Sequence, residues 1–333
     1  MLEWDRALKI CNTDLYLDSR QARSFCVVSH AHSDHLPDTP HGRTFATPAT
    51  AALAGYRSGL GEVVELDYGT RHAFCPDTEL RLLPAGHVVG SAMVQVARPE
   101  GTLLYTGDFK LRDSLTTAAA EPCRADVLVM ESTYGRPMFR FPPWRQVVAE
   151  LVERAQGALR AGRQPVVMGY SLGKAQEAVR ALTDAGLPVT CHGAVFAMNQ
   201  ISEQVGVRLG AYRRYRFEDF QGPAALDLAE RGVLVAPPHA ARSGFVTRFK
   251  DPLRIVLTGW AMLKGAQYRY GVDHALPLSD HADFDELLEL IDRVQPRKVF
   301  TYHGYREFVD TLRARGIDAY YAEPDAQLSL FGD

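Results

Sequence analysis

Three histidines and one aspartate lie within six consecutive positions near the start of the chain. His30, His32, Asp34 and His35 directly follow the apolar run 25–28, which predicts a strand. Near the end of an extended strand, residues two apart face the same side, so His30 and His32 can share one metal ion. Asp34 and His35 lie past the bend, which suits a second ion beside the first. A surface loop rich in histidine is the alternative, but it explains this spacing less well.

Four further residues that often bind metals each follow a predicted strand. They are His87, Asp108, Glu131 and His303, which come after the runs 80–83, 102–106, 127–130 and 298–301. Loops at strand ends bring distant residues together on a rigid frame, so we expect all these side chains to form one site. Zinc favours such nitrogen and oxygen ligands, and catalytic zinc keeps one position open for water.

Composition is that of an ordinary globular protein. The chain has 333 residues, of which 46% are hydrophobic and 23% charged, and this length favours two domains. No apolar stretch is long enough to span a bilayer, and the first ten residues lack the apolar core of a signal peptide. Five cysteines without a Cys-x-x-Cys pair indicate reduced thiols. We therefore expect a cytoplasmic protein without a membrane partner.

Net charge gives no whole-molecule attraction to nucleic acid, since it is −3. A local basic surface is sufficient for such binding, however. Two basic stretches are candidates, Arg208–Arg216 and Arg242–Arg254. Each is either a contact for nucleic acid or an ordinary solvated face.

The order of the ligand motifs resembles the metallo-β-lactamase superfamily. The motif begins at His30 and continues through His87 to Tyr105–Asp108. The resemblance implies an αββα sandwich, with two facing β-sheets, helices outside, and two metal ions at the sheet edge. The ligand sets that it implies are His30, His32 and His87 for one ion, and Asp34, His35 and His303 for the other, with Asp108 bridging both.

Three further motifs resemble those of the β-CASP nucleases within that superfamily. They are Glu131–Gly135, Ser279–Asp283 and Tyr302–Gly304. This group inserts a second α/β domain between the first and second of these motifs. The intervening segment contains predicted strands at 165–169, 187–191, 232–236 and 254–258, and a predicted helix at 173–185. We therefore expect a catalytic domain of residues 1–141 and 271–333, and a β-CASP cap domain of residues 142–270.

Two divalent ions can activate a water, neutralise a phosphate oxygen and hold attack and departure in line. Asp34 or Asp108 could orient the attacking water. The resemblance puts His281 beside the scissile phosphate, as general acid or charge partner, with Glu131 orienting its imidazole. A cap for the predicted helix 284–294 is the alternative role of His281, but Asp280 and Asp283 suit that role better.

The segment Gly169–Lys174 is predicted to join a strand to a helix in the cap domain. Backbone amides at a helix N-terminus bind phosphate well, and Lys174 adds positive charge. The segment resembles the corresponding cap motif of the family, so Ser171 and Lys174 are expected to contact the nucleic-acid backbone. A tight turn that needs both glycines is the alternative. The spacing of an ATP-binding P-loop is absent.

The C-terminal tail, residues 324–333, carries a short motif for a protein partner. Its residues Gln327, Leu328, Leu330 and Phe331 resemble the consensus of bacterial segments that bind the sliding clamp. An extended tail could bury the side chains of Leu330 and Phe331 on a partner while Gln327 hydrogen-bonds at the rim of the interface. A tail that packs on its own domain is the alternative.

The motifs leave the substrate open between DNA and RNA. His303 resembles the RNA-processing branch of the family, whereas the compact length, without an added C-terminal domain, resembles bacterial proteins found with DNA ligases. We expect a two-metal DNA exonuclease acting on single-stranded or end-exposed DNA in repair, with ligase-associated partners. Zinc is the expected metal, and manganese could replace it. A ribonuclease of the same family and a small-molecule metallohydrolase are the alternatives.

Overall fold

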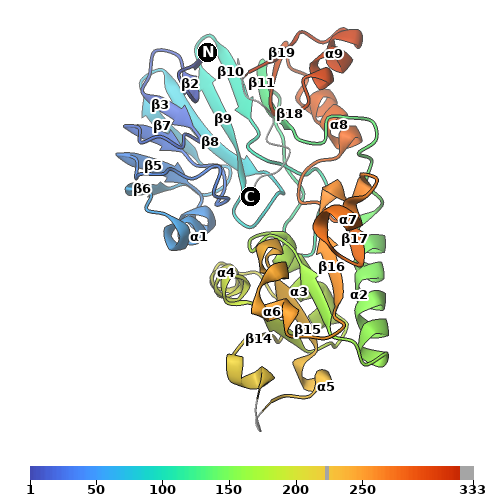
Figure 1. Cartoon of the computed structure of the whole chain (residues 1–333). Coiled ribbons are helices and arrows are strands. Elements are labelled where there is room, and N and C mark those ends of the chain that lie inside the picture. Colours follow the sequence, from blue (N-terminus) through green and yellow to red (C-terminus); the bar gives the residue numbers. More distant parts are fainter. Residues whose placement is uncertain (222–224, 323–333) are drawn as a thin grey trace. The chain divides into compact units, whose positions relative to one another are not determined.

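The computed structural model of the chain describes residues 1–221 and 225–322. Its contacts divide the chain into two compact units (Figure 1). The first contains residues 1–113, 117–140 and the chain from His281 onward, and the second contains residues 114–116 and 141–280.

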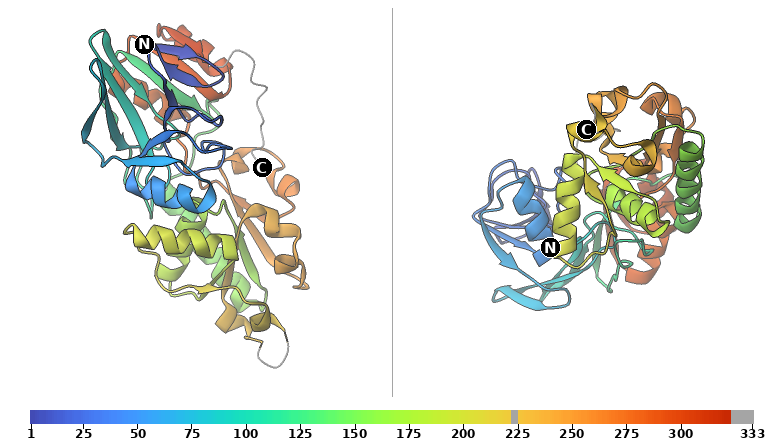
Figure 2. Two further views of the ribbon diagram at one scale, coloured as in Figure 1. Left: turned by 90° about the vertical axis from the view of Figure 1, so that its left-hand side faces the viewer. Right: turned by 90° about the horizontal axis from the view of Figure 1, so that it is seen from below.

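Two mixed sheets form the first unit, as Figures 1 and 2 show. One has the order β1 to β6, with β1 (Leu2–Trp4), β2 (Leu8–Ile10), β3 (Leu15–Leu17), β4 (Phe25–Val27), β5 (Arg43–Ala46) and β6 (Glu62–Glu65). The other has the order β19-β18-β11-β10-β9-β8-β7, with β7 (Arg71–Cys75), β8 (Thr78–Pro84), β9 (Ala92–Arg98), β10 (Gly101–Tyr105), β11 (Val127–Ser132), β18 (Lys298–Gly304) and β19 (Ala319–Tyr321).

Alternating side chains of the second sheet enter two different cores. Leu103 and Tyr105 of β10 pack with residues of the first sheet, whereas Leu104 packs with Leu287 and Phe308 on the opposite face. The helices on that face are α8 (Phe284–Val294) and α9 (Glu307–Ala314), and α1 (Pro48–Arg57) lies beside β5 and β6 (Figure 1). This layered αββα order confirms the sequence prediction.

A six-stranded parallel sheet forms the second unit. Its order is β14-β13-β15-β12-β16-β17, with β12 (Pro165–Met168), β13 (Val189–Cys191), β14 (Arg213–Arg214), β15 (Val233–Ala236), β16 (Leu253–Leu257) and β17 (His274–Leu276). Its helices are α2 (Trp144–Arg160), α3 (Lys174–Asp184), α4 (Gly193–Gln204), α5 (Leu228–Arg231), α6 (Gly244–Thr247) and α7 (Ala266–Tyr270), with 3-10 turns η1 (Phe217–Phe220), η2 (Pro238–Arg242) and η3 (Gly259–Met262). The runs of β12 and β15 are buried on both faces, which is typical of parallel sheets.

The contacts divide the chain ten residues after the boundary expected at residue 271. After the turn at Gly271 the chain returns to the second unit, because β17 pairs in parallel with β16. The second unit therefore ends at Asp280 and the first resumes at His281. At the other crossing, the units divide after Arg140 rather than after residue 141.

The predicted helix 284–294 is α8, and its cap is Asp283. The Asp283 carboxylate accepts hydrogen bonds from the amides of Asp285 at 3.0 Å and Glu286 at 2.9 Å. The Glu286 side chain accepts from the Asp283 amide at 3.1 Å, which completes a capping box. Asp280, the other predicted cap, instead forms a buried ion pair, described below.

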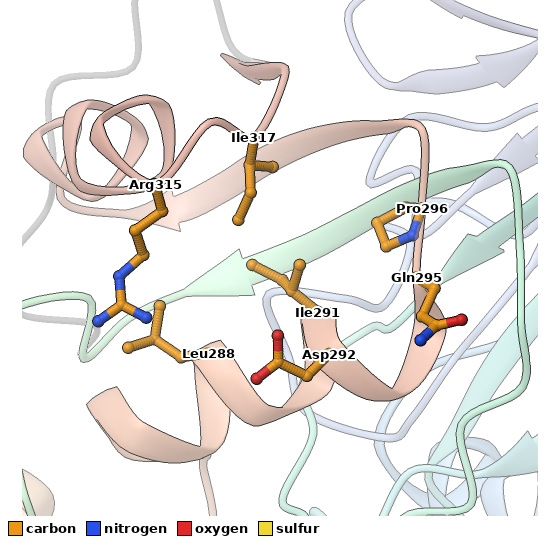
Figure 3. A pocket seen from close by; sticks show the side chains of 7 residues that line it. All are labelled: Leu288, Ile291, Asp292, Gln295, Pro296, Arg315 and Ile317. Atoms are coloured by element: carbon orange, nitrogen blue, oxygen red, sulfur yellow. The ribbon is translucent and has the colours of Figure 1, made fainter.

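Three remaining features bear on where a site can lie. A hollow of about 410 Å³ beside α8 is lined by Leu288, Ile291, Asp292, Gln295, Pro296, Arg315 and Ile317 (Figure 3). It holds one carboxylate and no group of metal ligands.

All five cysteines are free. Among the described residues, no helix is both long and apolar enough to cross a bilayer.

Candidate metal centre

The predicted ligands gather at one edge of the first unit. His30 to His35 follow β4, while His87 and Asp108 follow β8 and β10. Glu131 and His303 lie near the ends of β11 and β18. Since β10, β11 and β18 are parallel, and β8 has the same direction through the antiparallel β9, their carboxyl ends meet at the same edge.

Four of these residues form a first ligand group. One ligand atom from each of His30, His32, His87 and Asp108 lies within 4.8 Å of the others. His32 Nδ1 is 3.0 Å from His87 Nε2, and His30 Nε2 is 3.5 Å from Asp108 Oδ2. This is the set that the resemblance implies for one ion, together with its bridging carboxylate.

A second group shares Asp108 with the first. It contains His35, Asp108 and His303, again with ligand atoms within 4.8 Å of one another. Asp34 lies at its margin, because its Oδ2 is 3.9 Å from His35 Nε2 and 65% of its side chain is exposed. The role of Asp34 as a ligand or orienting base stays a prediction.

The donor atoms at the centre fit bound cations. His30 Nε2, His35 Nε2 and Asp108 Oδ1 are buried and have no hydrogen-bond partner among the described residues. Leaving such groups unsatisfied costs about 1–3 kcal/mol each. A cation between them would use the imidazole lone pairs and the carboxylate together, so the residues present suit metal binding.

Asp18, which the sequence reasoning missed, orients two of the ligands. Its Oδ2 lies 2.8 Å from His35 Nδ1 and accepts the Ser29 hydroxyl at 2.6 Å. Because the Ser29 hydroxyl donates to Asp18, its oxygen is left to accept the proton on Nδ1 of His30, 3.0 Å away. In both imidazoles Nδ1 is thus engaged, and Nε2 is directed to the ligand group. The signal in the sequence was its position directly after β3, the same strand-end position as the other ligands.

Protonation of the centre follows from burial and from the neighbouring charges. Burial lowers the pKa of His30 well below its usual value, and His35 lowers it further. Burial opposes ionisation of Asp108, but His35 and His281 hold its pKa well below the usual value. For His35 burial lowers the pKa, yet Asp108 and Asp18 outweigh this effect and raise it well above the usual value. A neutral His30 and an ionised Asp108 are the states that metal ligands require, whereas His35 holds a proton that it must release to bind a cation.

A bulge in β18 presents His303 to the second group. Glu131 pairs with Tyr302 and Ser132 pairs with Gly304, so His303 is the extra residue of a β-bulge. Its φ is +45°, a left-handed conformation that costs a non-glycine residue energy and often marks functional sites. Gly304 is required here, since a Cβ at that position would lie 1.9 Å from the Ser132 carbonyl oxygen.

Glu131 and His281 form a hydrogen-bonded pair beside the ligands. His281 Nδ1 lies 2.9 Å from both carboxylate oxygens of Glu131, and 3.9 Å from Asp108 Oδ2. Glu131 is fully buried and also accepts from the Phe109 amide at 2.9 Å and the Thr133 hydroxyl at 2.5 Å. The carboxylate is therefore fixed and can hold the imidazole in one orientation.

The structure gives Lys174 an internal partner in place of the exposed position that contact with a phosphate needs. Lys174 is 3% exposed, and its ammonium forms an ion pair with the carboxylate of Asp280, which is fully buried. Because each charge neutralises the other away from water, Lys174 has a structural role. Asp280 is for the same reason not a helix cap.

The helix N-terminus beside Lys174 is also satisfied internally. The amides of Ala175 and Gln176 donate to the carbonyls of Tyr170 and Gly173, and the Gly173 amide donates to the Gln176 side chain. Gly173 has φ of +97°, so the tight turn that needs a glycine is the reading the structure favours. Phosphate contact by Ser171 stays a prediction. The predicted clamp-binding residues Gln327, Leu328, Leu330 and Phe331 lie outside the described residues.

Replacing Asp18 by Asn should weaken metal binding without removing a ligand. The amide cannot accept the His35 and Ser29 protons as the carboxylate does, so we expect zinc affinity to fall about 10- to 100-fold. A chelator competition titration measures this change. The control is Asp14→Asn, which removes one exposed carboxylate nearby. Equal zinc affinity in the Asp18 variant and the control would contradict the orienting role.

Replacing Lys174 by Met should destabilise the chain by about 3–5 kcal/mol, because Asp280 would stay buried without its partner. Chemical unfolding measures this loss. The double variant Lys174→Met/Asp280→Asn should recover much of the stability, and the exposed Lys264→Met should stay within about 0.5 kcal/mol of the parent. A Lys174 variant with unchanged stability but weaker nucleic-acid binding would restore the original prediction.

Comparison with known proteins independently supports the assignment of the site to a metal-dependent hydrolase. Residues 269–326 match a family model described as the Zn-dependent metallo-hydrolase RNA specificity domain. A probable DNA ligase of Opitutus terrae is 39% identical over 316 residues, which cover 93% of this chain and 30% of that protein. The transcription termination factor FttA of Methanothermobacter thermautotrophicus is 30% identical over 56% of this chain and 35% of its own length. The chain thus spans about a third of these two relatives.

An RNase J-like protein of Methanocaldococcus jannaschii is similar over most of both chains. It is 22% identical, and the match covers 84% of this chain and 81% of that protein. The layered first unit, the inserted parallel sheet and the His/Asp ligand groups agree with these relationships. The chain belongs to the metallo-β-lactamase superfamily, within its β-CASP group.

Proposed function

We propose that the chain is a metal-dependent phosphodiesterase that hydrolyses nucleic acid. The observation that carries this proposal is the Glu131–His281 pair, whose imidazole nitrogen lies 3.9 Å from the carboxylate of Asp108. A small-molecule metallohydrolase has a use for the ligand groups but no evident use for this pair. Hydrolysis of a phosphodiester uses both the ligand groups and this pair, because the leaving oxygen must be protonated or stabilised by positive charge.

The ligand groups would hold two divalent ions that share Asp108. One group consists of His30, His32, His87 and Asp108, and the other of His35, Asp108 and His303, with Asp34 at its margin. When bound, such ions supply positive charge for the phosphate oxygens and make a water easier to deprotonate. Zinc is the proposed metal from the ligand types, with manganese as a substitute.

His281 is proposed to act on the leaving oxygen. Its Nδ1 is held by Glu131, so proton transfer would take place at Nε2. The buried carboxylate fixes the orientation of the ring and stabilises its protonated form, which can donate a proton. Asp34 or Asp108 would orient the attacking water.

We propose DNA as the substrate, in a single-stranded or end-exposed form, with exonuclease action in DNA repair. The relative named as a probable DNA ligase supports this choice, since it matches 93% of the chain. It also motivates the proposed association with ligase-linked repair proteins. Association with the sliding clamp is proposed from the motif at Gln327–Phe331 alone. A ribonuclease is the second candidate, favoured by the name of the matching family model and of the RNase J-like relative.

The experiment that tests this function compares substrates directly. Purified protein with zinc or manganese is incubated with end-labelled single-stranded DNA, RNA of matched sequence, and duplex DNA. We expect short products from DNA, formed from the ends and faster than those from RNA. Faster cleavage of RNA would establish the ribonuclease instead, and intact nucleic acid with hydrolysis of a lactam or thioester would favour the small-molecule enzyme.

Replacing His281 by Ala should slow the chemical step about 10²- to 10⁴-fold while the metal content stays unchanged. Single-turnover cleavage and elemental analysis of the same sample measure the two quantities. The control is His72→Ala, which removes a half-buried histidine of the same unit outside both ligand groups. Full activity after loss of His281 would refute its role, and loss of metal would show a structural one.

A further inference from the structure

The two basic stretches found in the sequence meet in the second unit. The first provides edge strand β14 and Tyr215 and is followed directly by the aromatic residues of η1, and the second provides α6 and Arg248. The guanidinium carbon of Arg248 lies 5.3 Å from the ring centre of Tyr215, 5.4 Å from that of Phe217 and 5.6 Å from that of Phe220. The rings of Tyr215 and Phe245 join the stretches further, with centres 4.8 Å apart. Segments 30 residues apart therefore form one surface.

The cations of this surface lack acidic partners within the described part of the chain. Arg213, Arg214 and Arg216 are exposed, and so are Arg242 and Lys250, yet none of them forms an ion pair there. Elsewhere in the same unit, Arg154 pairs with Glu150, Arg163 with Asp251 and Arg180 with Asp184. Glu218 and Asp219 of η1 follow the first stretch, and Asp251 in the second stretch pairs with Arg163, so the charges leave a positive excess. Charge that the protein does not neutralise itself is available to an anionic ligand.

An aromatic side chain stands among these cations. Phe217 directly follows Arg216 and is 55% exposed, which is unusual for a large apolar ring. Its ring also faces the Arg248 guanidinium. Guanidinium groups bind phosphates in a bidentate manner, and an exposed ring offers a face on which a base can stack. An acidic protein would use the charges but would leave the ring without a specific role.

We propose that Arg213, Arg214, Arg216, Phe217 and Arg248 form a binding surface for single-stranded nucleic acid, which we call the arginine–phenylalanine surface. The guanidinium groups contact backbone phosphates, and Phe217 stacks on a base. The surface would hold a strand by contacts additional to those at the metal centre. This inference rests on the proposed function for the class of ligand, but not for the chemistry of cleavage.

Binding of a labelled single-stranded phosphorothioate DNA, which resists hydrolysis, tests the proposal by fluorescence anisotropy over a series of salt concentrations. Arg213→Ala/Arg214→Ala should weaken binding about ten-fold and reduce the salt slope by about 1.4, because two phosphate contacts are lost. The matched control is Arg160→Ala/Lys264→Ala, which removes the same charge from exposed positions of the same unit. It should leave both quantities near those of the parent.

Phe217→Ala separates stacking from charge. It should weaken binding of the normal strand about ten-fold but leave an abasic strand of equal length unaffected. Hydrolysis of bis(p-nitrophenyl) phosphate, which is too small to reach a second surface, should be the same in all variants. If the parent protein does not hydrolyse this compound, the proposed function is refuted while the binding result remains valid.

Two results would overturn the proposal. One is equal weakening by the arginine double variant and its charge-matched control, which would show only a general charge effect. The other is parent-like binding and salt slope in both the arginine and the Phe217 variants. In that case the surface does not bind nucleic acid, and an acidic protein becomes the partner to seek.

Discussion

Buried ligand atoms that the described part of the chain leaves without a hydrogen-bond partner are the constraint on which the site depends. Two buried imidazole nitrogens, of His30 and His35, and one buried oxygen of Asp108 have no hydrogen-bond partner in the described chain. Folding removes these atoms from water, which is costly unless something replaces the lost hydrogen bonds. Divalent cations do so with the ligand types that are present, and the binding energy then contributes to the stability of the folded state.

Residues around the ligand groups hold the ligands in position and are not themselves ligands. Asp18 and His303 both have left-handed backbone conformations, and both lie at strand ends next to the ligand groups. Strain of this kind persists only where the neighbouring packing imposes it. Here the β-bulge that Gly304 permits and the hydrogen bonds of Asp18 impose it. The rigid sheets therefore fix the orientation of each ligand before any ion arrives.

Much of this arrangement was predictable because regular spacing reports on regular structure. The strands before His30, His87, Asp108 and His303 and the helix α8 follow from apolar runs and turn residues. Asp18 was missed because it follows a strand of three residues and belongs to no recognised motif. Its function depends on a fold that brings it to His35, and sequence spacing does not report that proximity.

The errors have equally local causes. The contacts divide the chain after the expected residue 271 because the short strand β17, of three residues, follows a turn at Gly271 that resembles an exit from the domain. Lys174 was assigned to phosphate because a lysine after a glycine turn is usually exposed, whereas here Asp280 neutralises it in the interior. Convergence of the two basic stretches is a tertiary effect that neither stretch reveals alone.

The number of divalent ions per chain tests the central claim most directly. Elemental analysis of protein purified without chelator or added metal, combined with anomalous diffraction at the zinc edge, gives both the stoichiometry and the positions. We expect two ions about the shared carboxylate of Asp108, one in each ligand group. Protein that binds no divalent ion at this edge, yet keeps its fold and full activity, would contradict it.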